Sequence, residues 1–357
     1  MREVTPPVKA ITYSRTGDSS VLELNERDVP EPGQDEVRIR LVLSGVNPTD
    51  WKRRAGSTVQ GLDFPEIVPN QDGAGVVDAV GPGVAGLSVD DRVWVFLAQH
   101  GRPTGTAQEY AVLPASRVVP LPDGVSFEVG ASLGVPAITA HRALTVSEEF
   151  PSRLHPGALD GATVLVAGGA GAVGHAAIQL ARWAGATVVT TVSGPEKAAL
   201  ATAAGAHHVV NYKTEDAASA IKAIAPHGVD IVVEVAPAQN AELDAAVLST
   251  RGTIAIYANN GGDSVTLPIR DNMAANARYQ FLVLYTLGDA ALGRARDDVT
   301  EAARAGVLEV GEAAGLPLHR FSLAETAAAH DAVEGGVTGK VLIEVGEGVE
   351  AVGVATR

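Results

Sequence analysis

The stretch TVLVAGGAGAVG, residues 163–174, decides the fold that this sequence predicts. Its first five residues are apolar and largely β-branched, which is typical of a buried strand, and the alanine-rich segment after Gly174 favours a helix. The glycines have the spacing G-x-G-x-x-G, which permits a tight turn and a close approach of the backbone to a phosphate. Free N–H groups at the helix start suit a pyrophosphate. The motif predicts a dinucleotide site formed by Gly169, Ala170, Gly171, Ala172, Val173 and Gly174.

The motif alone also fits a glycine-rich turn that binds nothing, so the segments after it have to decide. They alternate between helical and strand patterns, as a doubly wound parallel sheet requires. The expected helices are 176–184, 196–204, 217–225 and 241–248, and the expected strands are 187–192, 209–210, 230–235 and 253–257. Such a sheet binds dinucleotides at the carboxyl ends of its strands, so this context favours the dinucleotide site.

The segment before the motif predicts a different architecture. Short runs of alternating apolar and polar residues, such as EVRIRLVLSG at 36–45, continue as far as EYAVLP at 109–114 and indicate an antiparallel β region. Near the end of the chain, helices are expected at 289–305 and 323–334 and a strand at 340–345. We therefore predict the α/β class, with a Rossmann-type doubly wound parallel sheet and a second, mainly β domain.

The composition limits the possible functions. A chain of 357 residues is long enough for two domains, because single domains usually hold about 100 to 200 residues. It contains no cysteine, which excludes disulfides, iron–sulfur clusters, thiolate zinc sites and cysteine nucleophiles. The formal charge of −15 argues against a nucleic-acid or anionic-membrane partner. No apolar run approaches the roughly 18 residues of a membrane span, and we expect a cytoplasmic protein.

The end of the second predicted strand distinguishes between the two nicotinamide dinucleotides. A site specific for NAD usually carries an acidic residue there, whereas this chain reads TTVS at 190–193. Ser193 and Lys197 suit a 2′-phosphate, and Tyr212 after the third strand could close that pocket. Alternatively, Ser193 caps the next helix and Lys197 is a solvated surface residue. The pattern favours NADPH over NADH.

Four blocks together resemble the zinc-free quinone oxidoreductases, the zeta-crystallin group of the medium-chain dehydrogenase/reductase superfamily. They are GAGVVDAVGPGV, EYAVLPASRVVPLPDGVSFEVGASLGVPAITAHRAL, VLVAGGAGAVGHAAIQLARWAGATV and TGKVLIEV, and the resemblance covers residues 8–345. Enoyl and enone reductases share these blocks. The resemblance implies a GroES-like catalytic domain at 1–135, a Rossmann domain at 136–286, a C-terminal return to the catalytic domain at 287–357, and a homodimer built through the Rossmann domains.

The resemblance also implies catalytic residues. The family's NPxD motif falls on Asn47 to Asp50, and in zinc-dependent relatives a cysteine ligand stands in place of Asn47 and a histidine in place of Gln71. We therefore expect no metal and an electrophile that conjugation already activates. The amide of Asn47 would hold the nicotinamide ribose or a developing oxyanion, or Asn47 is only a turn residue before Pro48. The predicted catalytic residues are Asn47, Asp50 and Trp51.

Further positions are assigned to the cofactor by the resemblance alone, and each could equally be structural. Thr139 would face the phosphate or nicotinamide, the backbone at 281–285 the carboxamide, and Lys340 the phosphate end. The additional cofactor-binding candidates are Asn259, Asn260, Leu284 and Tyr285.

One departure from the family concerns the substrate. A tyrosine that many of these quinone reductases carry after NPxD is missing, and this chain reads WKRR at 51–54. Trp51 could stack on an aromatic substrate and Lys52 or Arg53 could attract an anion, or the charges form a solvated face.

Three functions remain open. The first is an NADPH-dependent, zinc-independent quinone reductase that transfers hydride or single electrons. The second is an NADPH-dependent reductase of enone or enoyl double bonds. The third is a cofactor-binding protein with a structural or RNA-binding role, against which the acidic balance speaks.

Overall fold

The computed structural model describes residues 6–57 and 62–346. The chain divides into two compact units. The first comprises the chain up to Val135 and again from Leu318, and the second is Pro136–Pro317. Within the described residues, no helix combines the length and the apolar character needed to cross a membrane.

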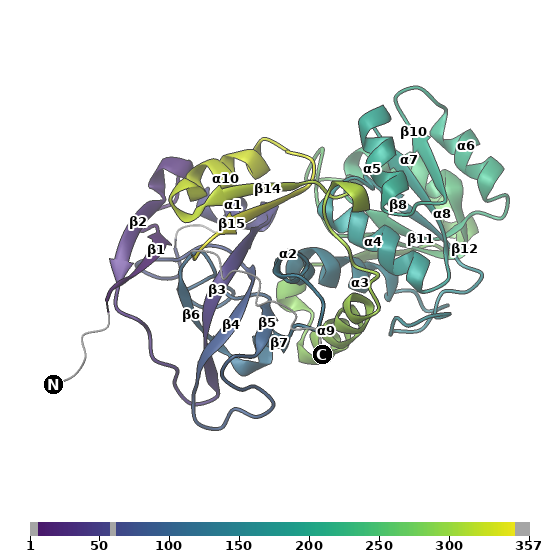
Figure 1. Ribbon diagram of the computed structural model, residues 1–357. Helices are drawn as coiled ribbons and strands as arrows, with labels where there is room; N and C mark the ends of the chain where they lie inside the picture. Colours follow the sequence, from purple (N-terminus) through teal and green to yellow (C-terminus); the bar gives the residue numbers. More distant parts are fainter. Residues whose placement is uncertain (1–5, 58–61, 347–357) are drawn as a thin grey trace. The chain divides into compact units, whose positions relative to one another are not determined.

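The first unit contains a mainly antiparallel sheet of seven strands, in which β14, β15, β3, β4, β5 and β7 follow one another and β6 pairs with β3 (Figure 1). Alternate side chains of β3, among them Val37, Ile39 and Leu41, are buried in its core, as the sequence pattern predicts. The strands are β3 (Glu36–Val46), β4 (Asp72–Val80), β5 (Arg92–Val95), β6 (Tyr110–Pro114), β7 (Val118–Pro120), β14 (Leu318–Ser322) and β15 (Lys340–Glu344). The other elements are β1 (Val8–Thr12), β2 (Glu23–Arg27), α1 (Pro48–Arg54), α2 (Phe127–Ser132) and α10 (Thr326–Glu334).

The pairing of β15 with β3 brings a C-terminal strand beside an N-terminal one. Val341 lies opposite Val46 in the antiparallel pair, which brings Lys340 level with Asn47. A side chain at Gly45 has no room, because a Cβ there would lie 2.2 Å from the carbonyl oxygen of Ala131. The C-terminal strand therefore places its first residue beside the start of α1.

The second unit contains a six-stranded parallel sheet in the order β10, β9, β8, β11, β12, β13. This confirms the predicted Rossmann-type fold. Chain order reverses between β8 and β11, the position where such sheets bind ligands. The strands are β8 (Thr163–Ala167), β9 (Thr187–Val192), β10 (His208–Asn211), β11 (Val229–Glu234), β12 (Leu248–Ile256) and β13 (Arg278–Phe281). The helices are α3 (Ile138–Leu144), α4 (Ala172–Trp183), α5 (Pro195–Ala203), α6 (Ala217–Ile224), α7 (Pro237–Val247), α8 (Ile269–Ala275) and α9 (Asp289–Arg304).

The family resemblance assigns the segment 287–317 to the C-terminal part of the catalytic domain. In the structure this segment belongs to the second unit. The reason is that α9 packs on α3. Asp298 of α9 lies 2.8 Å from His141 of α3 and accepts the N–H of Leu154 at 2.8 Å. The return to the first unit begins at Leu318.

Candidate functional site

Asn47 stands between the end of β3 and the first turn of α1. Its backbone is extended, and Pro48 follows at the first helical position, where a fixed φ favours the helix. The carboxyl group of Asp50 accepts the N–H of Asn47 at 2.7 Å and is buried. Asp50, predicted as a catalytic residue, therefore caps α1 and holds the backbone of Asn47.

The side chain of Asn47 is held at both ends. Its Nδ2 donates to the Asp72 carboxylate at 2.6 Å, and its Oδ1 accepts from the Lys340 ammonium at 2.7 Å. Asp72 also accepts the N–H of Val135 at 2.9 Å. Asn47, Asp72 and Lys340 are each at most 2% exposed. We call Asn47, Asp50, Asp72 and Lys340 the Asn47 cluster.

The structure corrects the expected position of Lys340. Instead of presenting its ammonium to the phosphate end of the cofactor, Lys340 is buried beside Asn47 and lies 3.9 Å from the Asp72 carboxylate. The register of β15 on β3 puts it there, and its positive charge compensates that carboxylate. A direct contact between Asn47 and a cofactor stays a prediction.

Burial controls the charges of the Asn47 cluster. It raises the pKa of Asp50 to about 8, with a further contribution from the neighbouring Asp72 carboxylate. It also raises the pKa of Asp72 to about 6, although the Lys340 ammonium opposes this shift. Burial lowers the pKa of Lys340. At neutral pH, Asp50 therefore holds a proton while Asp72 is ionised opposite the Lys340 ammonium.

The basic residues after Asp50 differ in exposure: Lys52 and Arg53 are half-buried, whereas Arg54 is fully buried and forms an ion pair with Glu334 at 2.6 Å. Trp51 is half-buried, and the Lys52 ammonium lies 5.9 Å from the centre of its ring. Arg53 forms an ion pair with Asp63 at 2.5 Å. Part of the WKRR run is thus engaged in local contacts, and the contribution of Trp51 to catalysis remains a prediction.

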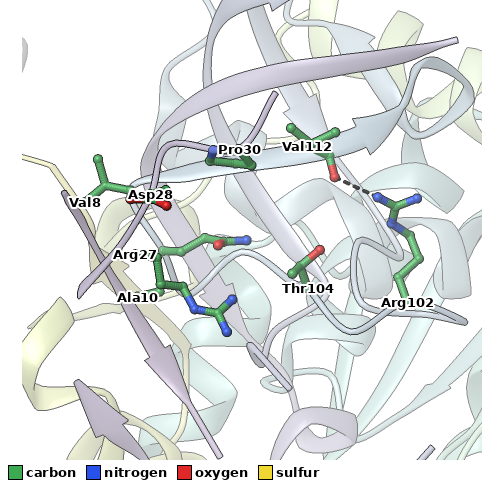
Figure 2. Close-up of a pocket in the computed structure, with 9 residues that line it drawn as sticks. Val8, Ala10, Arg27, Asp28, Pro30, Arg102, Thr104 and Val112 are labelled. Carbon is green, nitrogen blue, oxygen red and sulfur yellow. Dashed lines mark hydrogen bonds between the residues drawn. The ribbon is translucent and has the colours of Figure 1, made fainter. Parts of the chain in front are cut away.

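A small cavity lies elsewhere in the first unit (Figure 2). Its volume is about 100 Å³, below the roughly 300–1,000 Å³ of small-molecule sites. Its two arginines are engaged, because Arg102 donates to the Val112 carbonyl at 3.0 Å and pairs with Glu36, while Arg27 pairs with Glu66. This cavity is therefore no candidate for the substrate.

The predicted strand, turn and helix at 163–174 are present as β8, a turn and α4. A Cβ at Gly169 would lie 2.2 Å from the Thr190 hydroxyl, and one at Gly174 would lie 2.5 Å from the Gly168 carbonyl. Gly168 itself has a left-handed φ of 71° and is exposed, as is Gly171. The sequence prediction omitted Gly168, although the Gly-Gly pair at the strand end was a signal for it. The turn keeps its backbone open to a ligand, so its residues fit a dinucleotide.

The residues predicted for the 2′-phosphate follow two neighbouring strands. Tyr212 donates its N–H to the Val192 carbonyl at 3.2 Å, directly before Ser193, and its side chain is 48% exposed. Gly194, not Ser193, is the N-cap of α5, which removes the capping alternative for Ser193. Lys197 is exposed in the first turn of α5.

The remaining cofactor candidates differ in how they could act. Thr139 on α3 and Leu284 are buried, so the side chain of Leu284 packs inside and only its backbone suits a carboxamide. Asn259 and Asn260 are exposed after β12, and Asn260 donates its N–H to the Val235 carbonyl at 3.1 Å. Tyr285 is half-buried in the short helix Leu284–Thr286.

Comparisons with known proteins identify the family of this chain. Residues 33–123 match the alcohol dehydrogenase GroES-like domain, and residues 172–301 match the zinc-binding dehydrogenase family. A quinone oxidoreductase of Rattus norvegicus is 34% identical over 269 residues, which cover 75% of this chain and 77% of that protein. This chain belongs to the medium-chain dehydrogenase/reductase superfamily. Within it, the protein is a quinone oxidoreductase-like, NAD(P)H-dependent oxidoreductase.

Two further similarities bear on the cofactor and the substrate. A mycobacterial structure determined in complex with NADPH has a TM-score of 0.78 and 29% identity, covering 94% of this chain and 99% of that one. A 2-haloacrylate reductase of Burkholderia is 30% identical over 334 residues, which cover 90% of this chain and 94% of that protein.

The name of one matched family mentions zinc, but Asn47 and Gln71 stand at the positions of the zinc ligands of zinc-dependent relatives. The amide of Gln71 is paired with Gln99, whose N–H it accepts at 3.1 Å. Among residues 6–57 and 62–346, no group of three histidine or acidic side chains is arranged to hold a metal ion.

Sequence reasoning missed a buried acid pair in the second unit of this protein. Glu234 ends β11 and Asp244 lies on α7, and both are at most 2% exposed. Asn240 donates to both oxygens of Glu234, at 3.0 and 3.2 Å. Burial raises the pKa of Asp244 well above 3.8, and the hydrogen bond to Glu234 adds to the shift. Asp244 therefore keeps a proton that it shares with Glu234.

Replacing Asp244 by asparagine is expected to flatten the pH dependence of stability. The raised pKa means that the stabilisation is complete below about pH 3.8 and is lost as the pH rises through the folded-state value. An asparagine amide donates to Glu234 without titrating. Urea unfolding across the pH range should give a steeper decline for the wild type than for Asp244→Asn, with the exposed Glu242→Gln as control. Parallel curves for both proteins would contradict the shared proton.

Proposed function

We propose that this protein is an NADPH-dependent, zinc-independent reductase of quinones. The observation that carries the proposal is the Asn47 cluster, in which Asn47 occupies the position of a cysteine zinc ligand in zinc-dependent relatives. Asn47 is fixed there by Asp72 and Lys340, with distances of 2.6 and 2.7 Å. A quinone spreads the charge that reduction develops, so an oriented amide and a nearby ammonium suffice where an unactivated ketone needs a metal.

The nicotinamide supplies hydride or single electrons, and the chain's own residues bind and orient the reactants. The open turn at Gly168 and Gly171 and the start of α4 would hold the pyrophosphate. Ser193 and Lys197 would hold the 2′-phosphate, and Asn259, Asn260 and the backbone near Leu284 would hold the nicotinamide end. The fixed amide of Asn47 would orient the ribose or the reacting oxygen.

The preference for NADPH should depend on Lys197. Replacing it by alanine removes an exposed ammonium that suits a 2′-phosphate and changes no buried contact. We expect the KM for NADPH to rise about tenfold, since a charge-assisted hydrogen bond contributes roughly 1.5–3 kcal/mol, and the KM for NADH to stay unchanged. Steady-state kinetics with both cofactors measure this, with Lys222→Ala on α6 as the control. An equal rise for NADH would remove Lys197 from the phosphate site.

A second candidate is the reduction of a carbon–carbon double bond conjugated to a carbonyl or carboxylate. It is favoured by the 30% identity to a 2-haloacrylate reductase and by Lys52 beside Trp51, which suits an anionic substrate. The kcat/KM values for a small quinone, an uncharged enone and 2-chloroacrylate would separate the two functions. A preference for the quinone supports the first proposal, and a preference for either alkene supports the second.

We also propose a homodimer formed through the edge of the six-stranded sheet. β13 is an end strand of that sheet, and the neighbouring Ile269, Met273 and Phe281 are 73%, 75% and 60% exposed. An apolar edge of this kind favours pairing with a second copy. The double variant Ile269→Glu/Met273→Glu is expected to be monomeric in sedimentation experiments at concentrations where the wild type is dimeric. A monomeric wild type would refute the dimer.

A further inference from the structure

Four hydrogen bonds lead from a buried histidine to the Asn47 cluster. His330 Nε2 lies 2.9 Å from the side-chain oxygen of Asn70, whose Nδ2 donates to the Ser44 hydroxyl at 2.9 Å. The Ser44 and Thr106 hydroxyls are 2.7 Å apart, and Thr106 donates to the backbone carbonyl of Asp72 at 2.7 Å. All five residues are at most 1% exposed. We call this series the His330 chain.

The hydrogens of the His330 chain have a single arrangement. The Thr106 hydroxyl donates its only hydrogen to the Asp72 carbonyl, so its oxygen accepts from the Ser44 hydroxyl. The Ser44 oxygen in turn accepts from the Asn70 amide. The Asn70 oxygen must accept, so His330 carries a hydrogen on Nε2. Burial lowers the pKa of His330 to about 3, so the ring is neutral at neutral pH. A buried chain in which every donor points the same way is rigid.

The backbone of Asn70 indicates that its side chain is needed. Its φ is 77°, in the left-handed region that favours glycine. A glycine would adopt this angle freely but could not connect His330 to Ser44. Asparagine adopts this conformation more readily than most other non-glycine residues, so Asn70 combines the left-handed backbone with a side chain that can form hydrogen bonds. Here the two hydrogen bonds of the Asn70 side-chain amide hold the residue in place.

We propose that His330 is a positioning residue for the reaction, acting through Asn70, Ser44 and Thr106 on Asp72. This rests on the proposed function of Asn47. Thr106 fixes the backbone of Asp72, and the Asp72 carboxylate holds the Asn47 amide at 2.6 Å. Loss of the His330 chain frees the start of β4 and lets the Asn47 side-chain amide move. A displacement of about 1 Å can lower the reaction rate up to roughly a hundredfold.

The cleanest test is Asn70→Gly, which cuts the His330 chain while keeping the left-handed backbone. We expect kcat to fall about tenfold, with unchanged affinity for NADPH. His330→Ala should have the same effect, and His330→Gln should restore part of the rate because its amide supplies an N–H to Asn70. The matched control is Asn276→Gly, which replaces an exposed left-handed asparagine at the end of α8 and should leave kcat unchanged.

A second readout separates the positioning role from the function of Asn47. In protein labelled with ¹⁵N-asparagine, the Asn47 side-chain resonance, assigned with Asn47→Ala, should shift in Asn70→Gly and not in Asn276→Gly. An unshifted resonance overturns the positioning role, whatever the kinetics. A shifted resonance with unchanged kcat in both Asn70→Gly and Asn47→Ala upholds the positioning and refutes the catalytic role of Asn47. If Asn70→Gly still lowers kcat tenfold in the Asn47→Ala background, the chain acts elsewhere and the proposal fails.

Discussion

Replacing Lys340 by methionine is expected to lower the free energy of unfolding by about 3 to 5 kcal/mol, because it leaves a buried carboxylate without its cation. Lys340 is 1% exposed and Asp72 is fully buried, so water cannot replace the ammonium. Methionine keeps most of the volume, which makes the lost charge the main change. Urea unfolding of the two proteins at neutral pH measures the difference.

The double variant Lys340→Met/Asp72→Asn distinguishes the charge from the packing. It removes both charges, so it should be more stable than Lys340→Met alone. Lys52→Met, at a half-buried site on α1, serves as the surface control and should change stability by less than about 1 kcal/mol. A similarly small loss for Lys340→Met would contradict the buried ion pair.

Replacing Gly174 by alanine is expected to weaken NADPH binding about ten- to hundredfold. A Cβ there would lie 2.5 Å from the Gly168 carbonyl and 3.0 Å from Gly169 Cα, so the turn has to shift. Such overpacking typically costs roughly 1–3 kcal/mol. If this cost destabilises the NADPH-bound state, it corresponds to a roughly ten- to hundredfold weaker affinity. Titration of nicotinamide fluorescence gives the dissociation constant.

Gly293 provides a matched control for this variant. It also lies inside a helix, α9, but a Cβ there would have open space. Gly293→Ala should leave NADPH binding unchanged and stabilise the protein slightly, because alanine is the better helix former. Equal affinities for Gly174→Ala and the wild type would show that the turn does not hold the dinucleotide.

The parts of the fold that depend on local sequence were predictable. The strand at Thr163–Ala167 and the strand at Thr187–Val192 have the expected bounds, because short apolar runs between glycines and helical segments define them. The helix α9 was also expected near its observed bounds. The unit to which α9 belongs was not expected, because the hydrogen bond between Asp298 and His141 joins residues far apart in the chain.

The candidate site was predictable only in part. The motif on Asn47 and Asp50 marked the start of α1, but not the direction of their side chains. The place of Lys340 depends on the register of two strands from opposite ends of the chain, which no local pattern specifies. His330 and Asn70 are single polar residues within unremarkable segments, so their connection emerges only from the folded chain.

The most direct test of the account is the oxidation of NADPH by the purified protein with a small quinone, followed by nicotinamide absorbance after exhaustive chelation of metals. We expect turnover that chelation does not change and that Asn47→Ala lowers about a hundredfold, in the range that removal of an oxyanion donor costs in other enzymes. Absence of turnover with the quinone and with every conjugated alkene, or turnover that is lost on chelation and restored by zinc, would contradict it.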